Sequence, residues 1–121
     1  MVDFVKFEVP EKLMTDQLAL IAKVKKNGKI RIGINEVTKA IERGSAKLVL
    51  IASDVEPAEI VMHLPLICNE KDVPFSYVKT KKDLGEGVGI GVGTASIAIV
   101  EEGDAKSDLQ ELTKKLEDLR K

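Results

Sequence analysis

The side chains whose types and spacing could do chemistry gather within residues 33–39. Asn35, Glu36 and Lys39 are expected in the first turn of a short helix that begins at Asn35, and Glu36 and Lys39, three positions apart, share one face of it. A carboxylate accepts hydrogen bonds from the N1 and N2 donors of guanine, while amide and ammonium groups can donate to its O6 acceptor. The group therefore indicates contact with the edges of bases.

An ordinary structural explanation of the same residues stays open. Asn is a common helix cap, and Glu near a helix N-terminus compensates the helix dipole. A negative charge inside a basic segment, however, weakens binding to phosphates alone. Its presence favours recognition of base edges over simple attraction to a polyanion.

Charge is distributed unevenly along the chain. The net charge of -1 over 121 residues argues against a nucleic-acid partner, because such proteins usually have a basic balance. Residues 23–47 nevertheless hold eight basic side chains against two acidic ones, a local excess of six. The basic ones are Lys23, Lys25, Lys26, Lys29, Arg31, Lys39, Arg43 and Lys47. Residues 79–82 add a second cluster. If these charges lie close together in the folded protein, they form one positive face that attracts polyanions. If they lie apart, they only solvate the ends of helices.

Composition predicts a single aliphatic α/β domain over residues 1–121, with 44% hydrophobic and 32% charged residues. No apolar run approaches the roughly 20 residues of a membrane span, and residues 1–10 lack a signal-peptide pattern. We therefore expect a cytoplasmic protein without a membrane partner. The single cysteine, Cys68, has no disulfide partner and no zinc-ligand pattern around it, so neither a metal nor a cofactor is predicted.

Five glycines at odd positions between residues 85 and 93 suggest a nucleotide loop but do not match one. The offsets of two and five in the dinucleotide fingerprint cannot occur among them, and no Gly-Lys-Ser/Thr follows. A flexible connection between a helix and a strand is the default interpretation. Ile90 and Val92, aliphatic residues between glycines with no pattern that buries them, favour a contact with a ligand instead.

No catalytic constellation is visible. His63, the only histidine, lies between Met62 and Leu64 in an apolar segment, where a packed and hydrogen-bonded histidine is the expected outcome. The serines at positions 53 and 96 have no base pattern near them. The chain is therefore predicted not to be an enzyme; a small RNA-modifying enzyme is an alternative that the missing cofactor motif disfavours.

Strands and helices alternate along the chain. Strands are expected over residues 29–33, 48–52, 75–78 and 95–100, with the fully apolar run 48–52 at the centre of the sheet. Helices are expected over 10–27, 35–44, from Asp54 and Pro57 to His63, 65–71, 81–86, and from a capping box Ser107-x-x-Gln110 through a stripe of Leu109, Leu112, Leu116 and Leu119. This order favours a layered α/β fold with helices on both faces of a mixed sheet.

Several linked motifs lie in order over residues 10–101. They are Gly33-Ile34-Asn35-Glu36-Val37-Thr38-Lys39-Ala40-Ile41-Glu42-Arg43-Gly44, Ala46-Lys47-Leu48-Val49, Ala52-x-Asp54-Val55-x-Pro57, His63-Leu64-Pro65-Leu66, Lys81-Lys82-x-Leu84-Gly85, and Ala95-Ser96 to Ile99. Together they resemble the kink-turn RNA-binding family of the archaeal large-subunit ribosomal protein L-seven-Ae.

This resemblance implies a three-layer α/β/α sandwich with a central mixed sheet of four or five strands, and binding to kink-turn RNA, a bend built on tandem sheared G·A pairs. The helix with Asn35, Glu36 and Lys39 would enter the groove at the bend, Gly33 would allow close backbone approach, and the loop at 90–92 would lie against the protruding nucleotide. The RNA-binding residues expected from the residues and the resemblance together are Lys29, Arg31, Gly33, Asn35, Glu36, Lys39, Arg43, Lys82, Ile90, Gly91, Val92 and Thr94.

The resemblance also implies a non-catalytic protein, a monomer when free, that stabilises bent RNA and nucleates ribonucleoprotein assembly. Its RNA partners would be ribosomal RNA, box C/D and H/ACA guide RNAs and ribonuclease P RNA. Its assemblies would be the large ribosomal subunit, particles with a fibrillarin-type methyltransferase and Nop scaffold proteins, and the pseudouridine synthase particle. The alternative is a protein-interaction module of the same fold, whose helices at 54–72 and leucine stripe at 109–119 bind partners.

Two positions depart from the family's usual pattern. Ile32 stands where a basic residue is frequent, and Gly91-Val92-Gly93 stands where Glu-Val-Pro is common. The first departure predicts a weaker phosphate contact, and the second predicts a more mobile loop.

Overall fold

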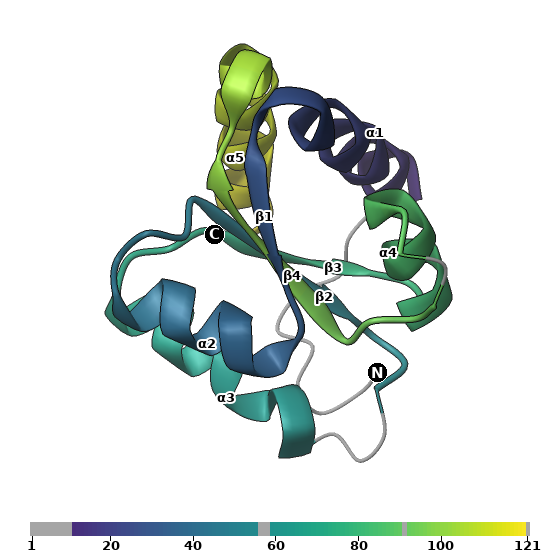
Figure 1. Ribbon diagram of the computed structural model, residues 1–121. Coiled ribbons are helices and arrows are strands. Elements are labelled where there is room, and N and C mark those ends of the chain that lie inside the picture. The colour runs from purple at the N-terminus through teal and green to yellow at the C-terminus, as the bar shows by residue number, and fades with distance from the viewer. Residues whose placement is uncertain (1–10, 56–58, 91, 121) are drawn as a thin grey trace.

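The computed structural model describes residues 11–55, 59–90 and 92–120 (Figure 1). Its strands are β1 (Lys29–Ile32), β2 (Leu48–Ala52), β3 (Phe75–Val78) and β4 (Ser96–Glu101). Its helices are α1 (Glu11–Asn27), α2 (Ile34–Glu42), α3 (Glu59–Glu70), α4 (Lys81–Val88) and α5 (Lys106–Arg120), with a short 3-10 turn, η1 (Gly103–Ala105), before α5. In the described part of the chain, no helix is both long and apolar enough to cross a membrane.

Four strands form a mixed sheet in the order β1-β4-β2-β3. β4 runs antiparallel to both of its neighbours, β1 and β2, while β2 and β3 are parallel. Every residue of β2 is buried, because it is an inner strand that helices cover on both sides. The prediction that residues 48–52 lie at the centre of a mixed sheet is therefore confirmed.

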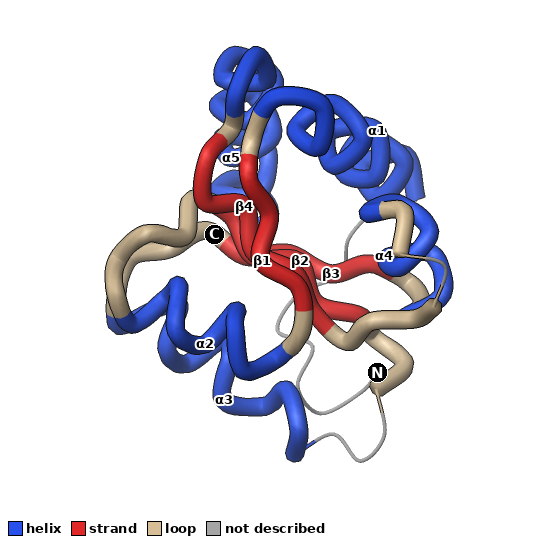
Figure 2. Tube along the Cα trace, in the orientation of Figure 1, coloured by secondary structure: helices blue, strands red, loops and turns tan. Residues whose placement is uncertain are grey.

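Helices cover both faces of this sheet. α2 and α3 pack side by side on one face, and α1 packs with α4 and α5 on the other (Figures 1 and 2). Val37 and Ile41 of α2 and Ile21 and Val24 of α1 are fully buried at helical spacing. The fold is thus the predicted three-layer α/β/α sandwich.

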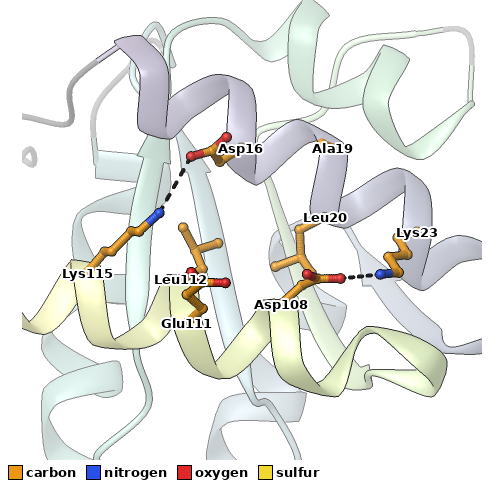
Figure 3. Close-up of a pocket in the computed structure, with 8 residues that line it drawn as sticks. All are labelled: Asp16, Ala19, Leu20, Lys23, Asp108, Glu111, Leu112 and Lys115. Atoms are coloured by element: carbon orange, nitrogen blue, oxygen red, sulfur yellow. Dashed lines mark hydrogen bonds and ion pairs between the residues drawn. The ribbon is translucent and has the colours of Figure 1, made fainter.

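α5 is fastened to α1 by leucines and two ion pairs. Leu109, Leu112 and Leu116 are buried, while the side chain of Leu119 lies outside the described residues. Figure 3 shows Asp16 facing Lys115, with 4.0 Å between carboxylate and ammonium, and Lys23 facing Asp108. The expected capping box at Ser107 is wrong: Lys106, before it, already has helical angles of φ −56° and ψ −48°, whereas a cap residue is non-helical.

The region after β2 also differs from expectation. α3 is one helix that continues through Pro65, where two short helices were predicted. Proline removes one backbone donor, but Leu64 and Cys68 on either side are fully buried and hold both halves against the core. Asp54 does not start α3; its carboxylate accepts a hydrogen bond from the backbone N–H of Lys81, at 2.8 Å, and so caps α4. Residues 56–58, including the expected start at Pro57, lie outside the described residues.

The glycine-rich segment divides between a helix and a connection. Gly85 and Gly87 belong to α4, whose first turn is capped by the Thr80 hydroxyl accepting from the Asp83 N–H at 3.0 Å. The helix ends at Gly89, which has left-handed angles of φ 76° and ψ 24°. Only the residues from Gly89 onward connect α4 to β4, so the loop is shorter than the glycine pattern indicated.

Candidate nucleic-acid interface

Gly33 positions the start of α2. It has φ 94° and ψ 155°, a conformation that is essentially confined to glycine. Its carbonyl accepts the first helical bond from the Val37 N–H at 2.9 Å, and its own N–H donates to the Ser96 carbonyl at 3.0 Å. α2 therefore begins at Ile34, one residue earlier than predicted, and Gly33 rather than Asn35 is the cap.

Asn35 and Glu36 are exposed in the first turn of α2. Asn35 makes no side-chain hydrogen bond within the described residues, and the cap position has no side-chain bond. The explanation of Asn35 as a helix cap is therefore wrong. Glu36 lies 3.9 Å from the ammonium of Lys39, and both side chains are about half exposed. Asn35 and Glu36 thus lie exposed in the first turn of α2, as predicted, whereas Lys39 lies in the last turn of this helix of nine residues and not in the first.

A groove runs between β1 and α2 beside this helix end. It has a volume of about 200 Å³ and is lined by Lys29, Arg31, Glu36, Ala40, Arg43, Ser45, Val100 and Glu101. Lys29 faces Glu101 at 3.9 Å, whereas Arg31 and Arg43 form no ion pair within the described residues. Both guanidinium groups are exposed and available to an anionic ligand, and guanidinium matches the geometry of phosphate. Four of the predicted site residues line this one groove.

The connection between α4 and β4 presents apolar side chains to solvent. Ile90 is 39% exposed and Val92 67% exposed, in agreement with the expectation that no pattern buries them. An ideal Cβ at Gly85 would lie 1.9 Å from the Val92 carbonyl oxygen, so only glycine lets the loop backbone approach α4 this closely. Gly91 lies outside the described residues, and the expected mobility of the loop stays a prediction.

One carbonyl connects the loop to the start of α2. The Ser96 carbonyl accepts both the Gly33 N–H, at 3.0 Å, and the Thr94 hydroxyl, at 3.2 Å. The Thr94 N–H in turn donates to the Lys81 carbonyl at 3.1 Å, next to exposed Lys82. Thr94 is only 7% exposed, so it positions the surface rather than lining it. The two halves of the predicted site therefore meet, through bonds that the sequence pattern did not reveal.

Replacing Gly85 with alanine should destabilise the fold and displace this loop. The added methyl group would meet backbone rather than a flexible side chain, and overpacking of this kind costs about 1–3 kcal/mol. Chemical denaturation would measure the loss. Gly87→Ala is the matched control in the same helix: its Cβ would lie 3.2 Å from a methyl group at the end of the Leu18 side chain, not from backbone, and alanine favours helix. Equal stability of the two variants would contradict the proposed close approach.

The basic segment 23–47 does not form one positive face. Lys23 lies on α1 across the sheet from α2 and pairs with Asp108. Lys47 lies 2.6 Å from a carboxylate oxygen of Glu102. The cations that remain together are those on β1 and α2, so the count along the chain overstated the charge available to one ligand.

His63 and Cys68 have structural surroundings. The Nε2 atom of His63 lies 3.0 Å from the Thr38 hydroxyl, a hydrogen bond that joins α3 to α2, and the ring is partly buried. The prediction of a packed, hydrogen-bonded histidine is confirmed. Cys68 is buried in α3, and no cluster of three metal-ligating side chains occurs among the residues that the structure describes.

The structure is thus a three-layer α/β/α protein in which α2 presents an amide, a carboxylate and an ammonium group to solvent, and the connection before β4 presents apolar side chains. The chain belongs to the Ribosomal protein L7Ae/L30e/S12e/Gadd45 family, whose model matches residues 16–109. It is also similar to the solved structure of the Giardia lamblia 15.5kD RNA binding protein, with 36% sequence identity over 92% of both chains and a TM-score of 0.84. Members of this family are non-catalytic, in agreement with the prediction that the chain is not an enzyme.

Proposed function

We propose that this protein binds RNA, recognises kink-turn motifs and stabilises their bent form, thereby nucleating ribonucleoprotein assembly. The observation that carries this proposal is the state of Asn35 and Glu36. Both lie exposed at a helix start that is capped by Gly33, so the fold itself does not need the Asn35 amide. Beside Lys39, these groups match the donors and acceptors on the edge of a guanine.

In the surrounding groove, different residues would bind the phosphates and recognise the bases. Arg31 and Arg43 would bind phosphates, which fixes the register of the RNA but carries no sequence information. Glu36 would repel phosphates and accept from guanine, so it would select the sheared G·A pairs at the bend. A regular A-form helix hides base edges in its narrow groove, whereas a kink exposes them.

Ile90 and Val92 support contact with an unpaired nucleotide. Exposed aliphatic side chains cannot hydrogen-bond, but they can cover the face of a base that has left the stack. The hydrogen bonds through Ser96 connect Thr94, at the end of this loop, to the start of α2. A surface that contacts the bent conformer better than the straight one binds it more tightly, and that difference in affinity shifts the RNA towards the bend.

A titration with two RNAs tests the proposal. We expect tight binding to a kink-turn RNA and much weaker binding to a control of equal length whose G·A pairs are replaced by Watson–Crick pairs. Equal affinity for both RNAs would sink the specific function. Turnover of RNA by the isolated protein, abolished by a single substitution, would instead support the alternative of a modifying enzyme.

The RNAs and assemblies in question belong to the same proposal. The similarity to an RNA binding protein and the motifs shared with the archaeal ribosomal protein L-seven-Ae support ribosomal RNA, guide RNAs and ribonuclease P RNA as ligands. A cytoplasmic location and a monomeric free form are part of it. Sequencing of the RNA that co-purifies with the native protein would identify which assembly it serves.

A protein-binding role is a second candidate function, favoured by one observation. Met62, 41% exposed, and Leu66, 61% exposed, lie four residues apart on α3, directly beside α2. We propose that a Nop scaffold protein covers this pair after RNA has bound to α2. Leu66→Ser should then leave RNA affinity unchanged and reduce recruitment of purified scaffold protein to the complex. Unchanged recruitment would contradict this role.

A further inference from the structure

A second basic groove lies between the start of β2 and α5. Its lining residues are Lys47, Pro74, Glu102, Lys106, Leu109, Gln110, Thr113 and Lys114. Lys106 and Lys114 are exposed, and Leu109 is buried beneath them. The exposed large apolar side chains of the described residues lie elsewhere, on α3 and in the connection before β4. The groove thus offers charge and hydrogen bonds, which suit a polyanion better than an apolar peptide.

Two of the three lysines in this groove form no ion pair within the described residues, although the charge of Lys106 also acts on Glu102. Lys47 pairs with Glu102, and this contact with the Lys47 ammonium holds the pKa of the Glu102 carboxyl below its ordinary value. Neither Lys106 nor Lys114 forms an ion pair with a carboxylate among the described residues. The two ammonium groups are therefore available to an anion that approaches along α5.

This groove and the first one lie near the same end of the sheet, on the faces that α5 and α2 cover, and the Lys47 N–H donates to the Ile99 carbonyl of β4 at 2.7 Å. Arg43 and Ser45 line the groove beside α2, and Lys47, two residues further on, lines the groove beside α5. Glu101, the last residue of β4, lines the groove beside α2, and Glu102, the next residue, lines the groove beside α5. In Figure 1 the connection from α2 to β2 runs along the left of the molecule, between α2 below and α5 above.

Cations outnumber carboxylates in the lining of the two grooves. Six cations line them, against three carboxylates, which leaves a surplus of three, whereas the whole chain has a net charge of -1. The cations are Lys29, Arg31, Arg43, Lys47, Lys106 and Lys114, and the carboxylates are Glu36, Glu101 and Glu102. Two basic grooves near one end of the sheet fit phosphates at separate positions along a nucleic-acid backbone.

We propose that the second groove binds the phosphate backbone of the RNA stem that leaves the kink, with Lys106 and Lys114 as the contacting residues. The proposal rests on the RNA-binding function proposed above and adds a second, sequence-independent contact to it. In this proposal α5 takes part in binding, because its cations would extend the contact with RNA from the bend into the flanking duplex.

The test compares Lys106→Gln/Lys114→Gln with the unchanged protein on two RNAs that share one kink-turn, one with a short flanking stem and one with a long stem. Titrations over a range of salt concentrations give the slope of log affinity against log salt. Loss of two phosphate contacts should reduce this slope by about 1.8 on the long RNA, since each contact to duplex contributes about 0.9. On the short RNA the slope should not change.

The matched control, Lys12→Gln/Lys26→Gln, removes the same charge from exposed positions on α1 and should leave both slopes unchanged. Equal slopes for the Lys106/Lys114 variant and the unchanged protein on the long RNA would overturn the proposal that the second groove binds RNA. An equal reduction of the slope on the long and the short RNA would overturn it as well. Failure of the proposed function shows differently, as equal affinity of the unchanged protein for kinked and G·A-replaced RNA. In that case, the salt dependence of binding to G·A-replaced RNAs with long and short stems would still show whether Lys106 and Lys114 bind the phosphate backbone.

Discussion

Replacing Glu36 with alanine should weaken binding to kink-turn RNA by about 1–3 kcal/mol and tighten binding to a plain RNA duplex. The two effects have opposite signs because the carboxylate accepts hydrogen bonds from guanine but repels phosphates. Attraction of phosphates alone would predict tighter binding to both RNAs once a negative charge is removed from a basic groove. Parallel titrations at one salt concentration separate the two cases.

Glu42→Ala is the matched control for this experiment. Glu42 is exposed at the last position of α2 and lies outside the groove, so its removal changes the charge of the same helix by the same amount. We expect little change in selectivity from it. Glu36→Gln keeps an acceptor oxygen without the charge and should lie between the other two. If Glu36→Ala retained full preference for the G·A pairs, the assignment of base recognition to Glu36 would be wrong.

Gly33→Ala should lower the free energy of unfolding by about 1–3 kcal/mol, because φ 94° with ψ 155° excludes a side chain. The strain would not arise from crowding, since no atom of the described residues, apart from Gly33 and its two chain neighbours, lies within 4 Å of the new Cβ. Relief of the strain requires rotation of Gly33, whose N–H and carbonyl bind Ser96 and Val37. The start of α2 would move relative to the loop, so affinity for kink-turn RNA should fall as well.

Gly44→Ala distinguishes this effect from a general loss of stability. Gly44 also has a positive φ, of 73°, and open space around its Cβ position, but it follows the opposite end of α2. Chemical denaturation should show both variants destabilised. RNA titrations, at a temperature where both are folded, should show a loss of preference for the G·A pairs for Gly33→Ala alone, because Gly44 adjoins Arg43, a phosphate contact that carries no sequence information. An equal preference in both variants would mean that the geometry of the Gly33 cap does not matter for base recognition.

Most of the fold could be predicted from short-range patterns. All residues of β2 are apolar because both faces of this strand are buried, and β1 alternates because only one of its faces is partly buried. Each pattern can be recognised within four or five consecutive residues. The helix over Pro65 and the cap at Gly33 could not be predicted in this way. Burial of Leu64 outweighs the lost backbone bond, and the bond to Ser96 fixes Gly33, so both depend on distant parts of the chain.

The candidate site was predicted in part for the same reason. Residues 29–43 are close in sequence, and the structure keeps them beside one groove. The link to the loop runs through the carbonyl of Ser96, a backbone atom that has no signature in a sequence. Lys106 and Lys114 lie among acidic residues of α5, which conceal their charge in any count along the chain.

β1 is an edge strand of the sheet, and its exposed side chains are Lys29 and Arg31. The unpaired backbone of an edge strand can add a strand from another molecule, and charged side chains along it oppose such pairing. The cations proposed to hold RNA therefore also protect the free protein from self-association until RNA covers them. Replacing Lys29 and Arg31 with apolar residues would therefore affect aggregation as well as RNA binding. Replacing them with glutamine, which is polar and of similar length, would change RNA binding without promoting aggregation.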